Sequence, residues 1–199
     1  MNTFEKILHT ARIEFARHGL AGARVDRIAS LAGVNKAMIY YHFRSKENLH
    51  RVVIDQELGK VKKLMEEALA QETDPESAFR KLSELFRSMF EDQDNFVPMF
   101  LREIASANPR FRKAFANAMS EKKRLTEKAK RLINDGKKKR LFRDVDSRHA
   151  MISFMGMNMG YLLMAPFVNS IWEIKDEEKF KKERPKQVVD LFLHGLRAK

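Results

Sequence analysis

The sequence predicts an all-α protein, on three observations. Apolar side chains recur at helical spacing from the beginning of the chain, at Phe4, Ile7, Leu8, Ala11 and Phe15. Asp74-Pro75 and Asn108-Pro109 are pairs of the kind that start helices, with a capping side chain followed by a proline in the first turn. No stretch alternates apolar and polar residues as strands do. We therefore expect about nine helices and no sheet.

The periodic segments predict the order of the elements along the chain. A first helix covers about residues 2–18 and ends at Gly19, a residue that suits a helix terminus. Two short helices at about 28–32 and 35–43 follow, and then a long one at about 45–71. Further helices are expected at 74–90, 96–107, 109–135, 147–164 and 185–196, with a loop or short helix at 173–184. The predicted domains are a three-helix domain at 1–48 and a larger helical domain at 49–199.

The stretch Val25–Leu49 predicts two short helices joined by a tight turn. Gly33-Val34 interrupts the first helix, and Asn35 can cap the second through its side-chain oxygen. In the second helix Ile39 and Phe43 are four residues apart and should point inward together. The opposite face then carries Ala37 and Tyr41 with Met38 beside them, Tyr40 and His42 lie on the flanks, and Lys36 is at the N-terminal tip. Such a helix suits insertion into the major groove of DNA.

The string AGVNKAMIYYHFRSKENL, preceded by Ile28-Ala29, resembles the helix-turn-helix of the TetR family of bacterial transcriptional regulators. The resemblance covers about residues 4–52 and departs from the family pattern at three places. Ala23-Arg24 stands where a threonine is usual, Ala37 where glycine is common, and Met38 where threonine or serine is common. Because the last two lie on the outer face, the base preference of relatives should not be transferred to this chain.

The resemblance and the helix geometry together predict a double-stranded DNA operator as partner. The predicted DNA-binding residues are Arg24, Lys36, Ala37, Met38, Tyr40, Tyr41, His42, Arg44 and Lys46. Arg44, Lys46 and the three aromatic residues would mainly contact phosphates. Lys36 is the candidate for a base edge, with apolar contacts from Ala37 and Met38, for example to a thymine methyl group. The alternative for Lys46 is an exposed lysine without a partner.

The charge of the chain agrees with a polyanionic partner. The formal net charge is +12 with a pI near 9.9, and residues 1–52 hold nine Lys or Arg and four Asp or Glu. Cations that replace the counterions of phosphates drive such binding, although a basic protein without this partner would have the same composition. The run Lys137–Arg140 is interpreted as a solvated connector rather than a DNA contact.

The C-terminal part is rich in phenylalanine and methionine, which predicts either an ordinary helical core or an apolar pocket. Thioethers and aromatic rings fill cores, but they also form adaptable ligand sites. The family resemblance favours a pocket for a small hydrophobic or aromatic effector, neutral or amphipathic. The candidate ligand-binding residues are Phe86, Met89, Phe90, Phe100, Phe115, Met119, Phe154, Met155, Met159 and Tyr161.

The last two long helices are expected, by resemblance, to form a homodimer. Gly156 and Gly160 would let two helices approach closely, and Val189, Phe192 and Leu196 give the last helix an apolar face. Two subunits would then form a four-helix bundle and bind an inverted repeat, that is, a palindromic operator. Packing of these faces within one chain is the alternative.

Several other classes of protein are not expected. The chain has no cysteine, which excludes disulfides and thiolate metal sites. Asp144, Asp146 and His149 could suggest a metal site, but the two acids fall at a helix start, where acids cap. No nucleophile elbow, phosphate loop or carboxylate pair is present. We expect no metal, no cofactor and no enzyme activity.

An uncharged segment, Ala150–Trp172, is long enough to span a bilayer. Its polar residues and proline favour a buried helix of a soluble protein instead, and the N-terminus does not resemble a secretory signal. We therefore expect no membrane association and a cytoplasmic location.

The sequence as a whole predicts a ligand-responsive transcriptional regulator, a repressor that binds its operator as a homodimer and is released by a hydrophobic small molecule. Two alternatives stay open. One is a DNA-binding protein regulated by a protein partner or by DNA alone, and the other is a small-molecule binding module or enzyme with a vestigial DNA-binding part.

Overall fold

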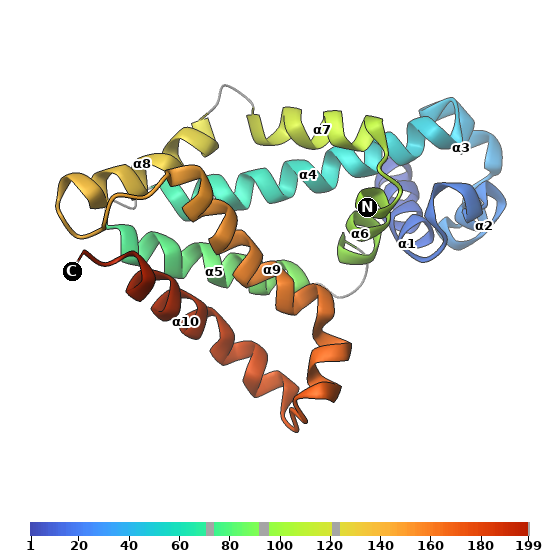
Figure 1. Ribbon diagram of the computed structural model, residues 1–199. Helices are drawn as coiled ribbons and strands as arrows, with labels where there is room; N and C mark the ends of the chain where they lie inside the picture. Colours follow the sequence, from blue (N-terminus) through green and yellow to red (C-terminus); the bar gives the residue numbers. More distant parts are fainter. Residues whose placement is uncertain (71–73, 92–95, 121–123, 199) are drawn as a thin grey trace. The chain divides into compact units, whose positions relative to one another are not determined.

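The computed structural model describes residues 1–70, 74–91, 96–120 and 124–198. Within these ranges the chain forms ten helices and no strand, so the all-α prediction is confirmed (Figure 1). The helices are α1 (Thr3–Gly22), α2 (Val25–Ala32), α3 (Lys36–Phe43), α4 (Lys46–Ala70), α5 (Pro75–Glu91), α6 (Phe96–Ala105), α7 (Pro109–Ser120), α8 (Arg124–Lys138), α9 (Ser147–Ile171) and α10 (Glu177–Leu196).

The helices divide into two compact units. The first unit is residues 1–62 and 92–118, and the second is residues 63–91 and 119–199. The expected three-helix segment 1–48 therefore packs together with the first part of α4 and with α6 and α7. In this first unit Ile28, Ile39 and Phe43, the predicted core anchors, are all buried. Met99 from α6 and Phe111 from α7 join the same core.

The second unit has an aromatic core between α5, α9 and α10. The ring centroids of Phe79, Phe154 and Phe192 lie between 4.9 and 5.1 Å from one another. Gly136 in α8 is required by close packing, because a Cβ there would lie 2.1 Å from the ring of Phe142. The single helix expected at 109–135 is described instead as α7 and α8, and α8 continues past Gly136 to Lys138.

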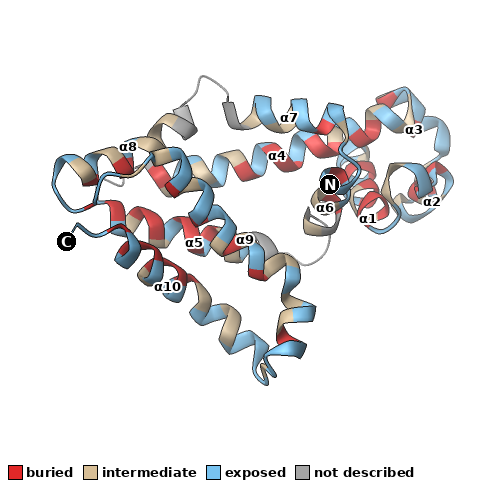
Figure 2. Ribbon diagram, viewed as in Figure 1, coloured by how far each residue is buried: buried red, intermediate tan, exposed pale blue. Residues whose placement is uncertain are grey.

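The last two helices are longer than predicted. α9 runs to Ile171 and contains Pro166, and α10 begins at Glu177 and contains Pro185, which was expected to start a helix. A capping aspartate explains the early start of α10, since the side chain of Asp176 accepts a hydrogen bond from the backbone N–H of Lys179. α9 was also expected to be buried, but Figure 2 shows that much of its surface is exposed.

Candidate nucleic-acid interface

The α2–turn–α3 segment is closed by three local interactions. Gly33 has φ +65 and ends α2, a conformation that glycine adopts without steric cost. The backbone N–H of Val34 donates to the carbonyl of Ala29, and the side chain of Asn35 accepts from the N–H of Ala37 at 2.8 Å. The predicted turn and N-cap are therefore confirmed.

α3 has one buried face and one exposed face. Ile39 and Phe43 are almost completely buried, whereas Ala37, Met38 and Tyr40 are exposed and Tyr41 is open over 69% of its surface. Anchoring by two large apolar side chains fixes the helix, so its outer residues are presented on a rigid support. This is the arrangement that groove insertion requires.

His42 differs from the other predicted contacts, because its ring is half-buried. It lies 5.8 Å from the ring of Phe4, edge to face, and its Nε2 is buried without a hydrogen-bond partner among the described residues. This position favours support of the neighbouring tyrosine, whose ring centroid is 5.2 Å away, over direct contact with DNA.

Arg44 connects α3 to α4 in a strained conformation. Its backbone has φ 66 and ψ −42, and the N–H of Ser45 donates to the carbonyl of Phe43 at 2.7 Å, which closes a γ-turn around Arg44. A γ-turn with positive φ is rare and costly for a residue with a Cβ. The side-chain amide of Asn48 also donates to the carbonyl of Phe43, at 2.8 Å. The exposed side chain of Arg44 is thereby held beside α3.

Lys46 has partners within the chain. Its Nζ donates to the carbonyls of Ala23 at 3.2 Å and Ala21 at 3.4 Å, at the C-terminal end of α1. The alternative of a lysine without a partner is therefore wrong. The cation lies where the dipole of α1 favours positive charge, and it fastens the start of α4 to the end of α1. Contact with a phosphate stays a prediction.

The missing threonine before α2 is replaced by a buried carboxylate. The N-cap residue Arg24 makes no capping bond with its own side chain, but its N–H donates to Oε1 of Glu14 at 2.9 Å. Glu14 is 3% exposed, and Arg27 Nε lies 3.4 Å from the same oxygen. A negative charge at a helix N-terminus is stabilising. A glutamate within the apolar stripe of α1 is the sequence signal for this role.

Lys36 is paired with an acid that the sequence reasoning missed. Its Nζ lies 2.7 Å from Oδ1 of Asp26, in the first turn of α2. The hydrogen bond and the charge of Asp26 raise the pKa of Lys36, and those of Lys36 lower the pKa of Asp26. The signal was available, because Asp26 is the only acidic residue between Arg24 and Lys46.

Comparison with known proteins agrees with this geometry. Residues 7–53 match the family model described as bacterial regulatory proteins of the tetR family. The N-terminal part of the chain is therefore similar to the DNA-binding part of tetR-family regulators. The transcriptional repressor SCO4008 of Streptomyces coelicolor is 40% identical over 74 residues, which are 37% of this chain and 35% of that repressor. The transcriptional repressor NicS of Pseudomonas putida is 27% identical over 98% of this chain and 92% of its own length.

The solved structure of the TetR-family regulator PfmR from Thermus thermophilus has a TM-score of 0.69 and 26% identity, over 96% of this chain and 99% of that one. The relatives and the solved structure named here are transcriptional regulators, and the family match at residues 7–53 includes the α2–turn–α3 segment. The relatives and the fold of the chain are those of regulators rather than enzymes.

The predicted effector residues lie in both units. Phe100 and Phe115 are in the first, with ring centroids 5.8 Å apart. Phe86 and Phe154 are in the second, 6.4 Å apart. Met155 is exposed, Met159 half-buried, and Tyr161 buried with its hydroxyl donating to Asn169 Oδ1 at 3.0 Å. The side chains of Met89, Phe90 and Met119 lie outside the described residues. Lining of an effector pocket by these residues stays a prediction.

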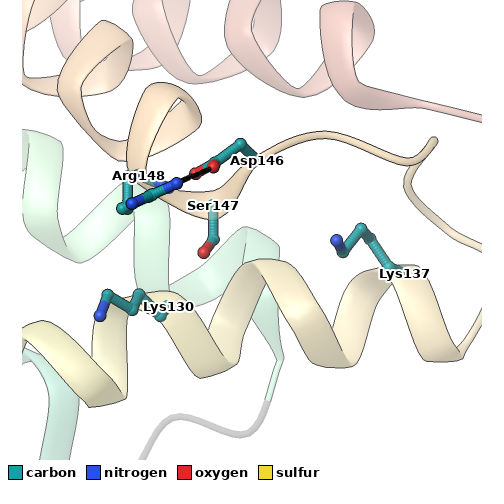
Figure 3. A pocket seen from close by; sticks show the side chains of 5 residues that line it. All are labelled: Lys130, Lys137, Asp146, Ser147 and Arg148. Carbon is teal, nitrogen blue, oxygen red and sulfur yellow. Dashed lines mark hydrogen bonds and ion pairs between the residues drawn. The ribbon is translucent and has the colours of Figure 1, made fainter.

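The second unit has an open hollow of about 340 Å³ between α8 and the start of α9. It is lined by Lys130, Lys137, Asp146, Ser147 and Arg148 (Figure 3). Arg148 is ion-paired with Asp146 at 2.6 Å, and Lys137 with Asp144 at 3.1 Å. This polar lining differs from the apolar pocket that the sequence predicts.

The acids at this hollow have structural roles. The side chain of Asp146 caps α9 by accepting from the N–H of Arg148, as the helix-start interpretation predicted. Hydrogen bonds from the side chain and backbone of Arg148 hold the pKa of Asp146 well below its ordinary value. Among the described residues no group of three His, Cys, Asp or Glu is arranged to hold a metal.

α9 carries an exposed apolar stripe, which we define as Ile152, Gly156, Gly160, Met164, Phe167 and Ile171. Phe167 is 68% and Ile171 75% exposed. A Cβ added at either glycine meets nothing within 4 Å, so packing inside the subunit does not require these glycines. By length and composition α9 could also cross a membrane, although that is weak support, because helices of soluble proteins meet the same test.

Proposed function

We propose that the chain is a homodimeric repressor that binds a palindromic operator through α3 and is released by a hydrophobic or aromatic small molecule. One observation carries the DNA-binding part, namely a helix anchored by Ile39 and Phe43 that presents a basic and aromatic outer face. The similarity to the repressors SCO4008 and NicS supports repression. A cytoplasmic location follows from this function, because the operator is there.

The proposed contacts are tested by selecting DNA sites from a random pool, with and without candidate ligands. We expect an inverted repeat whose binding weakens steeply with salt. Lys36→Ala should relax sequence preference, and Lys46→Ala should weaken binding to all sequences alike. Equal discrimination by the Lys36→Ala variant and the unaltered protein in a gel-shift series would contradict base reading by Lys36.

The proposed dimer is supported by the exposed apolar stripe of α9. A large exposed apolar patch marks an interaction surface, and two open glycines would allow a second helix to approach closely. Leu191 on α10 is also exposed, whereas Val189, Phe192 and Leu196 are buried inside the subunit. The proposed surface of α10 therefore differs from the one that the sequence indicated. Light scattering that finds only monomer at micromolar concentration would refute the dimer.

The proposed effector is tested by a thermal-shift panel of hydrophobic and aromatic compounds, which should include at least one that raises the melting temperature. One observation favours the alternative of control by a protein partner or by DNA alone. Phe154 is fully buried between Phe79 and Phe192, so this part of the predicted pocket is filled by the chain itself. The absence of stabilisation by every compound would favour that alternative.

A further inference from the structure

A single acid lies on the DNA-facing segment, and it is bonded to the candidate base reader. From Arg24 to Lys46 the chain has five basic residues and one acid, Asp26. Its Oδ1 lies 2.7 Å from Lys36 Nζ, although the two side chains are 63% and 47% exposed. The pair joins the first turn of α2 to the first residue of α3, at the tip of the exposed face.

The first turn of α2 favours an acid at Asp26, but the ion pair with Lys36 adds little further stability. Ion pairs that are exposed to this degree contribute little to folding, because water and salt screen them. Near DNA a carboxylate is unfavourable, since it repels phosphates and cancels a cation that would release counterions. An acid retained on such a surface therefore needs a partner other than phosphate. Base edges in the major groove provide one, because cytosine presents an amino group.

We propose that Asp26 and Lys36 read one G·C base pair as a unit, with Lys36 donating to guanine O6 and N7 and Asp26 accepting from cytosine N4. This inference rests on the proposed function, in which α3 enters the major groove. Guanine O6 and cytosine N4 are hydrogen-bonded to each other, so they lie about 2.9 Å apart. The separation of Lys36 Nζ and Asp26 Oδ1 is 2.7 Å. The ion pair therefore matches the spacing of the base-pair edge.

The ion pair can be kept while both bases are bound. An ammonium group has three N–H donors, and a carboxylate has several acceptor positions. An A·T pair fits less well, because thymine O4 is a single acceptor with a methyl group beside it, whereas guanine offers two adjacent acceptors to the ammonium. Asp26 is thus a specificity-determining residue, and Lys36 alone would distinguish base pairs less sharply.

The test combines variants of Asp26 with a modified operator. In the site selected by the unaltered protein, each fixed G·C pair is replaced in turn by guanine opposite pyrimidin-2-one, which lacks the N4 amino group. At one position per half-site the unaltered protein should lose about tenfold in affinity. Asp26→Ala should lose about tenfold on the natural site and nothing further on the modified one. Asp26→Asn keeps an acceptor oxygen and should keep part of the preference.

Glu47→Ala is the matched control, because it removes an exposed negative charge from the first turn of α4. It should tighten binding to all sequences alike without changing preference. The reading of G·C is refuted if Asp26→Ala also tightens binding to all sequences alike. It is refuted as well if, at every position, loss of the cytosine amino group weakens binding equally in the unaltered protein and in Asp26→Ala. Failure of the proposed function has a different result, since the unaltered protein then shows no sequence-selective binding at all. Unchanged thermal midpoints verify that both variants fold.

Discussion

The two units bury different kinds of polar side chain. The first unit buries charged groups that pair between helices, as with Glu57, whose Oε2 lies 3.7 Å from Nη1 of Arg12, and Glu103, whose Oε1 lies 3.0 Å from Nε2 of His50. The described polar residues buried in the second unit are neutral, namely Ser83, Asn158 and Asn169. The second unit instead exposes apolar side chains along α9.

The difference in buried polar groups fits the different partner proposed for each unit. In the first unit buried ion pairs join α1 to α4 and α4 to α6. This packing supports α2 and α3, which carry the surface proposed to bind DNA. A buried pair is costly to break because one charge is left without compensation. The second unit leaves its apolar area uncovered, which suits a surface completed by another chain.

Phe167→Asp should prevent dimerisation and reduce operator affinity by at least about 100-fold, because two linked half-site contacts become two independent ones. Analytical ultracentrifugation and a gel-shift titration measure the two effects. Leu141→Asp is the control, since Leu141 is also exposed in the second unit but lies outside α9 and α10. A dimeric Phe167→Asp variant would show that the exposed stripe has another purpose.

Glu103→Ala should lower the free energy of unfolding by about 3 kcal/mol, because His50 is left buried without its partner. Replacement of both His50 and Glu103 by leucine should lower the free energy of unfolding much less.

Burial would raise the pKa of Glu103, but hydrogen bonds from His50 and Asn108 outweigh it and hold the pKa below 4.5. A lowered pKa in the folded state gives stability above pH 4.5 that is lost as the pH falls through the folded value. Urea denaturation at several pH values should therefore show the variant and the unaltered protein converging in acid.

Arg44→Gly should raise the free energy of unfolding by about 1 kcal/mol, because relief of backbone strain exceeds the entropy cost of glycine. The same change should weaken DNA binding and reduce its salt dependence by about one phosphate contact. Arg44→Ala separates the two effects, since it removes the cation but keeps the strain. A glycine variant that is less stable than the alanine variant would disprove stored strain at this turn.

Lys46→Met should cost about 1 kcal/mol of stability, because the carbonyls of Ala21 and Ala23 lose a charged donor while the apolar stem is kept. Lys63→Met is a suitable control, since Lys63 is on the same helix and, among the described residues, makes an exposed ion pair with Glu67. Chemical denaturation measures the free energy of unfolding of the Lys46→Met and Lys63→Met variants. Equal stability of both variants would mean that Lys46 does not fasten α4 to α1.

Periodicity and capping residues predicted most of the helices and the anchors of α3, because burial of Ile39 and Phe43 follows directly from their spacing. They did not separate α7 from α8, which were expected as one helix at 109–135. The end of α9 and the start of α10 were missed, and each of these helices contains a proline, Pro166 and Pro185, although proline is more usual at helix ends. The partners of Lys36 and Lys46 were missed for another reason. Each bond joins residues that are ten or more positions apart, so only the packing of the helices brings them together.

The corner at Arg44 joins α3 directly to the long helix α4. α4 has 25 residues and is therefore about 37 Å long. In its first turn Asn48 donates a hydrogen bond to the carbonyl of Phe43, and Lys46 donates to the carbonyl of Ala23 at the end of α1. These bonds restrict movement of α4 relative to α1 and α3. A tilt of α4 by about 5° displaces one end relative to the other by about 3 Å. In the proposed regulator a displacement of this size would equal about one base step, which is about 3.4 Å.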